Sequence, residues 1–459
     1  MKLRVLLYMA VVALCVQSCK LGHRYSKPTV NIPGGYGVAT VEDNDTFSIA
    51  DLRWWEIYTD TVLQSLIEKT VRNNKDLKAA EARIRELAAR RRIDAANLLP
   101  QLNGNVYAQK EATNYGGDNY KNDPELGVKA SISWEADLWG NLRWAKDEGT
   151  AQFLESIENK RALTVSLVAQ VAETYFELVA LYNELHIVKQ TLNARTEGVR
   201  LAKLRYEGGL TSETSYLQAQ VEYARTATHI PVLERDIALK ENELSYLTDD
   251  WTSRIRHVSM SDSIGMMTNL PAGIPSSLLE RRPDIRAAEQ RVIAANAAVG
   301  VAYTNRFPRL TLTAQYGAES ETLSTLLKSP VYFLSGALLG PIIDMGRRQS
   351  AYRAQQHVYE QVCYDYEKSV MNAFKETRNA IISFNKATAI CESMATLESS
   401  SKSTMELAQL QYINGVIGYL DVLDAQRSYF DAQLGLSNAL CAKRLAMVQL
   451  YKALGGGWL

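Results

Sequence analysis

One stretch of sequence decides the fold class of this chain. It is residues 126–138, Leu-Gly-Val-Lys-Ala-Ser-Ile-Ser-Trp-Glu-Ala-Asp-Leu. Apolar side chains occupy every second position, and Lys129, Glu135 and Asp137 occur between them. Because successive side chains of a β-strand point to opposite faces, this alternation predicts a strand with one apolar face and one polar face that carries charges.

Three further strands are expected from the same kind of pattern. Alternation is weaker at 101–109 and 309–316, and residues 331–339 are evenly apolar. The four segments form one hairpin in each half of the chain. Strands of about ten residues have the length that an outer-membrane barrel requires. A small soluble sheet is the alternative that the pattern leaves open.

Very long helices are expected in the rest of the chain. No proline lies between Pro124 and Pro231 or after Pro341, and residues 347–414 also lack glycine. In the first of these segments an apolar residue recurs every three or four positions, at Leu163, Leu167, Val171, Tyr175, Leu178, Tyr182, Leu185, Val188 and Leu192. A single helix cannot bury such a stripe, so it must pack on neighbours along its length, as in a coiled coil or a helical tube.

The chain contains an internal duplication. Residues 76–102 align with 284–310 without a gap, and residues 201–209 align with 407–415 at nearly the same shift. One unit of about 200 residues has therefore been used twice. The expected division is a signal peptide (1–18), a lipidated N-terminal segment (19–58), a first structural repeat (59–250), an equatorial linker (251–275) and a second structural repeat (276–459).

The N-terminus has the features of an export signal. After a basic start, the apolar run of 5–16 is too short to span a bilayer. It ends at Val16-Gln17-Ser18-Cys19, which is similar to a bacterial lipobox, with Gln17 as an unusual member. Acylation of Cys19, including palmitate, would anchor the chain, and Lys20 in the next position favours the outer membrane. A plain secretory signal with an incidental cysteine is the alternative.

Composition and motifs argue against nucleic-acid binding, metal binding and catalysis. The 51 Lys and Arg balance 51 Asp and Glu, which leaves no cationic surplus for a phosphate backbone. The five histidines have no ligand spacing, and neither C-x-x-C nor H-E-x-x-H occurs. Cys363, Cys391 and Cys441 are too few and scattered for a disulfide framework. No Ser/His/Asp grouping or phosphate-binding glycine loop is present, so we expect no enzyme and no cofactor.

Several motifs occur in a fixed order along the chain. They are Trp54-Trp55 followed by 74–83 (NKDLKAAEAR), 281–289 (RRPDIRAAE), 412–427 (Tyr412 to Arg427, with LDVLDAQR at its end) and 450–458 (LYKALGGGW). With these motifs the chain resembles the TolC-like outer-membrane efflux proteins, most closely their lipoprotein branch, over essentially its whole mature length. The resemblance implies a mainly α protein with a membrane β-barrel.

The resemblance also implies an assembly and a function. Four strands are too few to close a barrel, whereas three chains would supply twelve and leave a lumen. The expected homotrimer joins this barrel to a periplasmic α-helical barrel, and it passively exports drugs, toxic compounds or metal ions. A periplasmic adaptor would connect it to an inner-membrane pump. The alternatives are the duct of a protein secretion system and a non-conducting trimeric coiled coil on the surface.

Two glycine turns are the expected adaptor-contacting tips. Their residues are Gly208, Gly209, Leu210, Thr211 and Ser212 in the first repeat, and Asn414, Gly415 and Val416 in the second. A long helix that reverses direction commonly ends in a left-handed residue, which glycine adopts without strain. Ordinary helix caps with no role in docking are the alternative.

The resemblance implies a narrow periplasmic entrance formed by Asp421, Asp424, Ile417, Tyr419, Tyr412 and Ser215. Asp421 and Asp424 share one helix face, so three chains would place a ring of carboxylates around the aperture and attract cations. A solvated helix face is the alternative. Ser215 stands where the family often has aspartate, and Ile417-Gly418 replaces an Asp-Asn pair that is frequent in the lipoprotein branch. We therefore expect fewer polar links here.

Overall fold

The computed structural model describes six segments of the chain, namely residues 20–31, 35, 52–113, 121–251, 281–340 and 342–456. The expected signal peptide, Cys19 and nearly all of the expected linker lie outside the described residues.

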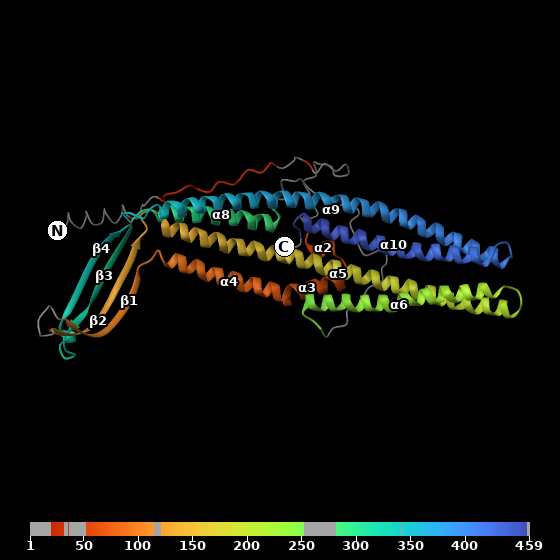
Figure 1. The fold of residues 1–459 in the computed structure, drawn as a ribbon, viewed down its shortest axis with the longest axis horizontal. Helices are drawn as coiled ribbons and strands as arrows, with labels where there is room; N and C mark the ends of the chain where they lie inside the picture. The colour runs from red at the N-terminus through yellow and green to blue at the C-terminus, as the bar shows by residue number, and fades with distance from the viewer. Residues whose placement is uncertain are drawn as a thin grey trace. The chain divides into compact units, whose positions relative to one another are not determined.

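The described chain is mainly helical and contains four strands (Figure 1). The elements of its first part are α2 (Trp54–Ile57), α3 (Thr61–Asn73), α4 (Lys75–Ala96), β1 (Gln101–Thr113), β2 (Lys121–Ala136), α5 (Asn141–Glu207) and α6 (Glu213–Thr248). Those of its second part are α8 (Pro283–Thr304), β3 (Arg309–Ser320), the 3-10 turn η3 (Leu326–Lys328), β4 (Pro330–Leu339), α9 (Arg347–Ile413) and α10 (Tyr419–Ala453). The four predicted strands are confirmed. All four run beyond a predicted bound, and β2 begins at Lys121 and ends at Ala136 rather than running from Leu126 to Leu138.

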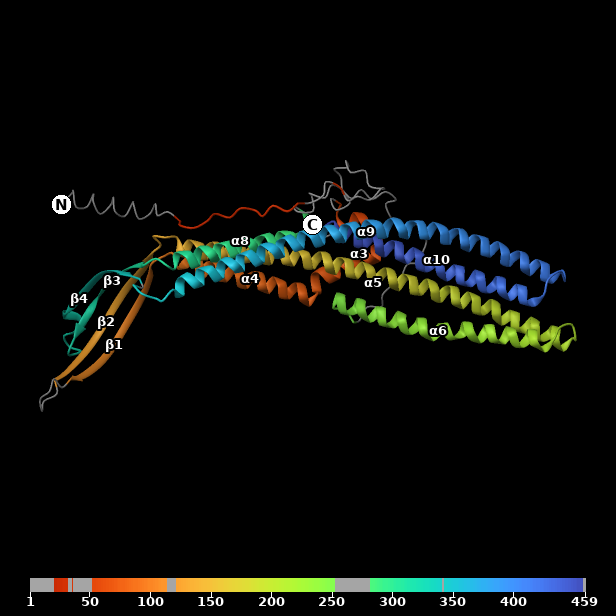
Figure 2. The same ribbon diagram turned by 45° about the horizontal axis from the view of Figure 1, so that its top comes forward.

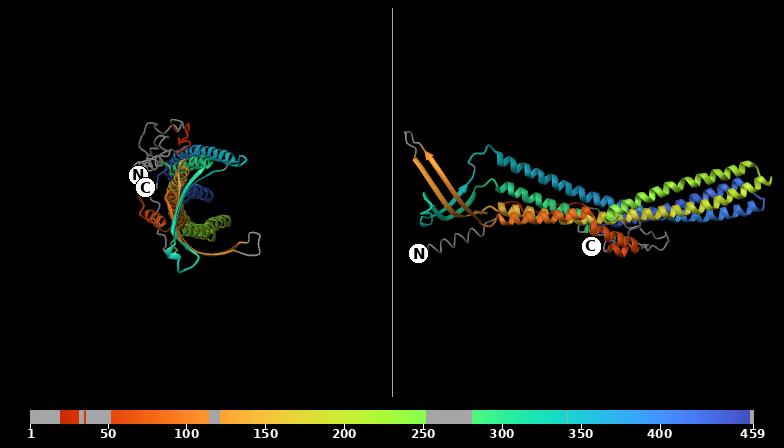
Figure 3. Two further views of the ribbon diagram at one scale, coloured as in Figure 1. Left: turned by 90° about the vertical axis from the view of Figure 1, so that its left-hand side faces the viewer. Right: turned by 90° about the horizontal axis from the view of Figure 1, so that it is seen from below.

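The duplication is visible in the lengths of the elements. Helices α4 and α8 both have 22 residues, and α5 and α9 both have 67. Each long helix turns back into a second one, so that α5 with α6 and α9 with α10 form two helical hairpins (Figure 3, right). The uninterrupted helix predicted over 347–414 is confirmed.

The strands form one antiparallel sheet in the order β1-β2-β3-β4 (Figure 2). Strands β2 and β3 pair over eleven positions, from Leu126 opposite Ser320 to Ala136 opposite Leu310. Because β2 comes from the first repeat and β3 from the second, this pairing joins the two repeats. The strands curve together when the sheet is seen end-on (Figure 3, left).

The described residues divide into two compact units, and each unit contains segments of both repeats. The first comprises residues up to 29, 82–157 and 287–368, and includes the sheet. The second comprises 30–81, 158–286 and 369–459. It includes α6, α10 and the parts of α5 and α9 that follow residues 157 and 368.

The core of the second unit is built on α5. Tyr175, Leu178 and Val188 from the predicted stripe are fully buried, together with Val448 of α10. Among the described helices, α5 has one stretch that is long and apolar enough to cross a bilayer, but most of this stretch is buried in the protein. The stripe is therefore a packing surface between helices.

Two helical glycines allow a test of the packing in the first unit. A Cβ at Gly300 of α8 would lie 2.4 Å from the ring of Trp144, whereas a Cβ at Gly198 of α5 would meet only the Tyr419 hydroxyl at 3.9 Å. Alanine in place of helical glycine gains about 1 kcal/mol. Overpacking costs about 1–3 kcal/mol and outweighs this gain at Gly300. We expect Gly300→Ala to lower the thermal unfolding midpoint and Gly198→Ala to raise it. Equal shifts of the two variants would contradict the packing around Trp144.

Candidate functional site

One face of the sheet is apolar across all four strands. The residues that the register places on this face include Leu102, Val106, Val128, Ala130, Ile132, Trp134, Leu312, Ala314, Tyr316, Tyr332, Leu334 and Leu338. Large members of the set are exposed, among them Val106 at 77%, Leu334 at 76% and Tyr332 at 81%. An apolar surface of this kind is stable only when lipid or protein covers it.

The opposite face is polar on β1, β2 and β3. Lys129 pairs with Glu319 of β3 at 2.5 Å, and the Tyr107 hydroxyl donates to Glu125 at 2.5 Å. Arg309 lies 3.8 Å from Glu135. These cross-strand pairs compensate the charges within the sheet, so this face is suited to water.

The sheet has two edges without a partner strand among the described residues. Strand β1 pairs only with β2, and β4 pairs only with β3. Their outer N–H and C=O groups are therefore available to strands of another chain.

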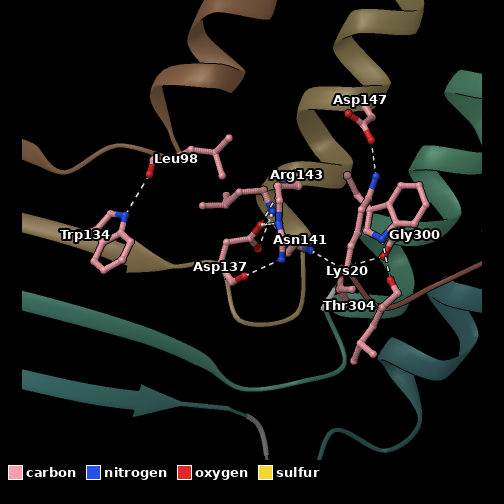
Figure 4. A network of polar contacts seen from close by, with 12 residues as sticks. Lys20, Leu98, Trp134, Asp137, Asn141, Arg143, Asp147, Gly300 and Thr304 are labelled. Carbon is pink, nitrogen blue, oxygen red and sulfur yellow. Dashed lines mark hydrogen bonds and ion pairs between the residues drawn. The ribbon is translucent and has the colours of Figure 1, made fainter. Parts of the chain in front are cut away.

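A polar network fixes the turn from β2 into α5 (Figure 4). Asp137 accepts hydrogen bonds from the backbone N–H groups of Leu142 and Arg143, both at 3.1 Å, and thereby caps α5. The Asn141 side-chain amide donates to Val301 O at 3.1 Å and to Thr304 Oγ1 at 2.9 Å, which ties the turn to α8.

The turn from β4 into α9 repeats this device. Asp344 accepts from the backbone N–H groups of Gly346, at 3.2 Å, and Arg348, at 3.3 Å. Gly140 and Gly346 each have a positive φ, of 83° and 80°, immediately before the respective helix. Both repeats therefore change from strand to helix through a glycine and an aspartate cap.

The described N-terminal residues pack on the first of these turns. Leu21 N donates to Trp139 O at 3.1 Å, and Trp144 Nε1 donates to Leu21 O at 2.7 Å. Lys20 lies over the Trp144 ring, 3.3 Å from its centroid, and pairs with Asp147 (Figure 4). The residue next to Cys19 is thus held at the end of the sheet.

The two predicted tips have the same hydrogen-bond pattern. Gly209 and Gly415 have φ values of 71° and 75°. Leu210 N donates to Arg205 O at 2.8 Å, and Val416 N donates to Gln411 O at 2.9 Å. Each is a Schellman motif, which satisfies the last carbonyls of α5 and α9.

The apolar residues after the two glycines are exposed. Leu210 is 73% exposed and Val416 is 70% exposed. Thr211 is half-buried, and Ser212, Gly208 and Asn414 are exposed. The tips therefore present equivalent apolar surfaces in the two repeats.

The structure brings some of the predicted entrance residues together. Tyr412 and Tyr419 lie with their ring centroids 5.6 Å apart, and Arg205 lies 4.8 Å from the Tyr412 centroid. Asp421 accepts the Gly418 N–H at 3.0 Å and so caps α10.

The other entrance residues do not join this group. Asp421 and Asp424 are exposed on α10, while Ile417 and Ser215 are half-buried. A carboxylate ring needs further copies of the chain and stays a prediction.

A buried ionic cluster, not predicted from the sequence, links the two hairpins. Glu222 of α6 is 2% exposed, and its carboxylate lies 2.6 Å from Arg427 of α10 and 3.1 Å from Arg195 of α5. Arg225 lies 3.5 Å from the same carboxylate. Glu222 lies three residues after Ala219 and four before Thr226, and all three are buried on the inward face of α6. A charged residue at helical spacing among inward positions is the signal in the sequence that could have revealed this cluster.

Electrostatics keep Glu222 ionised. Burial alone would raise its pKa, but the hydrogen bond from Arg427 and the charges of Arg195, Arg427 and Arg225 hold the pKa below its usual value. The nearby Tyr419 has a raised pKa, mainly because of burial and then because of Tyr412 and Glu222. Its hydroxyl therefore stays neutral.

Within the described residues, no group of three or more histidine, cysteine, aspartate or glutamate side chains is placed to hold a metal ion. Cys363, Cys391 and Cys441 are unpaired thiols, the last two buried. Lone buried thiols of this kind are packing groups rather than a reactive set.

Comparisons with known proteins agree with this geometry. The profile of the family described as "Outer membrane efflux protein" matches residues 66–248 and 274–456, one match in each repeat. The chain is 29% identical over 439 residues to the pyoverdine export outer membrane protein OpmQ of Pseudomonas putida, covering 94% of this chain and 93% of that protein. It is 28% identical over 456 residues to the cation efflux system protein CusC of Escherichia coli, covering 97% of each. The solved outer-membrane channel OprN superposes with a TM-score of 0.89 at 25% identity, over 96% of this chain and all of that one.

The ionic cluster yields a prediction of stability and its pH dependence. Glu222→Gln leaves Arg195 buried without a counter-charge, and removing one partner of a buried pair costs about 3–5 kcal/mol. Because the folded pKa of Glu222 is lowered, its contribution is complete above the ordinary value of 4.5 and is lost as the pH falls through the folded value. Thermal midpoints of variant and parent protein should differ at pH 7 and converge in acid.

The matched control for this experiment lies on the same helix. Glu234 pairs with Lys189 at 3.5 Å with both side chains more than half exposed, so Glu234→Gln should change stability by at most about 1 kcal/mol. Equal effects of the two substitutions at pH 7 would show that the Glu222 cluster does not hold the hairpins.

Proposed function

The chain belongs to the outer membrane efflux protein family, and on this premise we propose that it forms the outer-membrane duct of a tripartite efflux system. The observation that carries the proposal is the sheet, which has one exposed apolar face, one polar face and two unpaired edges. In an otherwise helical chain, such a sheet is suited to a barrel with lipid outside and water inside.

The duct is a homotrimer. Backbone groups at a sheet edge cannot remain unpaired in lipid, so β1 of one copy pairs with β4 of the next. The sheet contributes four strands per chain. Three chains thus give a barrel of about twelve, wide enough to leave an aqueous lumen, whereas two would give about eight and fill the interior with side chains.

The apolar tips are the docking surface for a periplasmic adaptor, which connects the duct to an inner-membrane pump. Leu204 and Leu410 occupy equivalent positions before the tips and are 53% and 57% exposed. With Leu210 and Val416 they give each chain two similar apolar surfaces. Asp421 and Asp424 of the three copies surround the aperture beside these tips, and their carboxylates favour cations over anions.

Lipid anchoring is the second membrane attachment. The contacts of Lys20 and Leu21 hold the chain next to Cys19 at the end of the sheet. Acyl chains on Cys19 would therefore enter the leaflet beside the barrel and stabilise its position.

The cargo is small molecules selected by the pump. Relatives at similar identity are named for pyoverdine export and for cation efflux, so family membership by itself specifies no substrate. Transport through the duct is passive in this proposal, and the pump supplies the energy. A protein-secretion duct is the second candidate; export dependent on an adaptor and pump would distinguish the two.

The membrane assignment is tested by lysine substitutions on opposite faces of β1. Val106 lies on the apolar face, and Asn103 lies on the polar face opposite Ser131. A lysine facing the middle of the bilayer costs about 2–4 kcal/mol, while one facing water costs little. We expect Val106→Lys to reduce the amount of trimer in the outer membrane and Asn103→Lys to preserve both trimer and ion conductance in planar bilayers. Normal assembly of both variants would exclude lipid contact.

The tips are tested by valine and asparagine at the two glycines. No atom lies within 4 Å of a Cβ built on Gly209 or Gly415, so any effect comes from the backbone. Valine at a positive φ costs about 1–2 kcal/mol per site, whereas asparagine adopts this region readily. The double valine variant should assemble normally but lose most efflux and adaptor binding. The double asparagine variant should retain both, and full efflux with valine would place docking elsewhere.

A further inference from the structure

A cavity of about 480 Å³ lies between the two helical hairpins near their tips. Its walls come from α5, α6, α9 and α10, all within the second compact unit. Most of the wall is apolar, and its lining residues include Leu201, Ala202, Val422, Tyr412 and Tyr419. The volume is that of a site for a small organic ligand rather than for a peptide.

The charges in the wall are unevenly compensated. Arg195 pairs with Glu222, and Glu197 pairs with Arg200 at 2.8 Å. Arg205, by contrast, has no acidic group within ion-pair distance among the described residues, and its Nε is buried without a hydrogen-bond partner. The guanidinium lies over the Tyr412 ring, 4.8 Å from the centroid.

This arrangement determines the chemistry of a ligand. The Arg205 guanidinium lines the cavity and has no acidic group within ion-pair distance in the described part of the chain, so an anion beside it would compensate its charge and accept charge-assisted hydrogen bonds. The aromatic and leucine walls require an apolar, preferably planar body beside the anionic group. A cationic ligand would face Arg205, and the exposed Asp421 and Asp424 are not part of the wall.

We propose that this cavity binds a small amphipathic organic anion, with an aromatic body against the apolar wall beside the two tyrosines and a carboxylate or sulfonate on Arg205. Because all four helices contribute to the wall, a bound ligand stabilises the arrangement of the hairpins seen here. The site exists in a single chain and does not depend on the proposed duct.

The test measures binding to the purified full-length protein by isothermal titration calorimetry, with naphthalene-2-sulfonate as the probe. Its neutral isostere, naphthalene-2-sulfonamide, reports the contribution of the charge. We expect the sulfonate to bind about tenfold more tightly than the sulfonamide, because hydrogen bonds to a charged group are the stronger ones.

Two variants test separately how the aromatic body and the anionic group of the ligand contribute to binding. Gly198→Leu directs a side chain into the cavity, where the glycine leaves space before Tyr419, and should abolish binding of both probes. Arg205→Met should weaken the sulfonate to the level of the sulfonamide. Lys203→Met, which removes a charge from the exposed face of α5 and does not line the cavity, is the matched control and should bind as the parent does.

The proposal is overturned if the sulfonate does not bind, if Gly198→Leu leaves its affinity unchanged, or if Arg205→Met and Lys203→Met weaken it equally. None of these measurements depends on transport. A negative result would therefore contradict the proposed binding site but not the proposed duct, and evidence against the duct would not contradict the binding site.

Discussion

The unpaired edges of the four-stranded sheet are the constraint on which the rest of the proposed assembly depends. In water, an edge strand can hydrogen-bond to solvent, but lipid offers no such partner. A sheet with its apolar face towards lipid must therefore close through other copies of the chain. Each strand pair continues directly into a long helix, β1 and β2 into α5 and β3 and β4 into α9.

The junctions between strands and helices hold the direction of each helix relative to the strand before it. The chain solves the problem twice, with Gly140 and Asp137 before α5, and with Gly346 and Asp344 before α9. In both cases the aspartate accepts hydrogen bonds from N–H groups at the start of the helix, where no carbonyl partner exists. Both repeats thus share this strand-to-helix turn as well as their sequence pattern.

At the other end of the helices, the hairpins are joined by charge rather than by apolar packing alone. The carboxylate of Glu222 is shared between Arg195 and Arg427, at 3.1 and 2.6 Å. Such a cluster is a weak source of net stability but a strong penalty on any arrangement that separates its members. Next to it lies the cavity with Arg205, whose charge is not compensated by an acidic group within ion-pair distance among the residues that the structure describes.

The sequence by itself determined the features that are local or periodic: the four strands, the long helices, the duplication and the two glycine turns. Alternation, stripe spacing and a left-handed glycine are properties of a few neighbouring residues, so they can be recognised along the chain. Only the tertiary structure decided that Glu222 meets arginines from two other helices, that Lys20 packs on Trp144, and that Arg205 lines a cavity without a counter-charge. These contacts join residues up to 205 positions apart, and no local pattern specifies which distant side chain fills a given inward position.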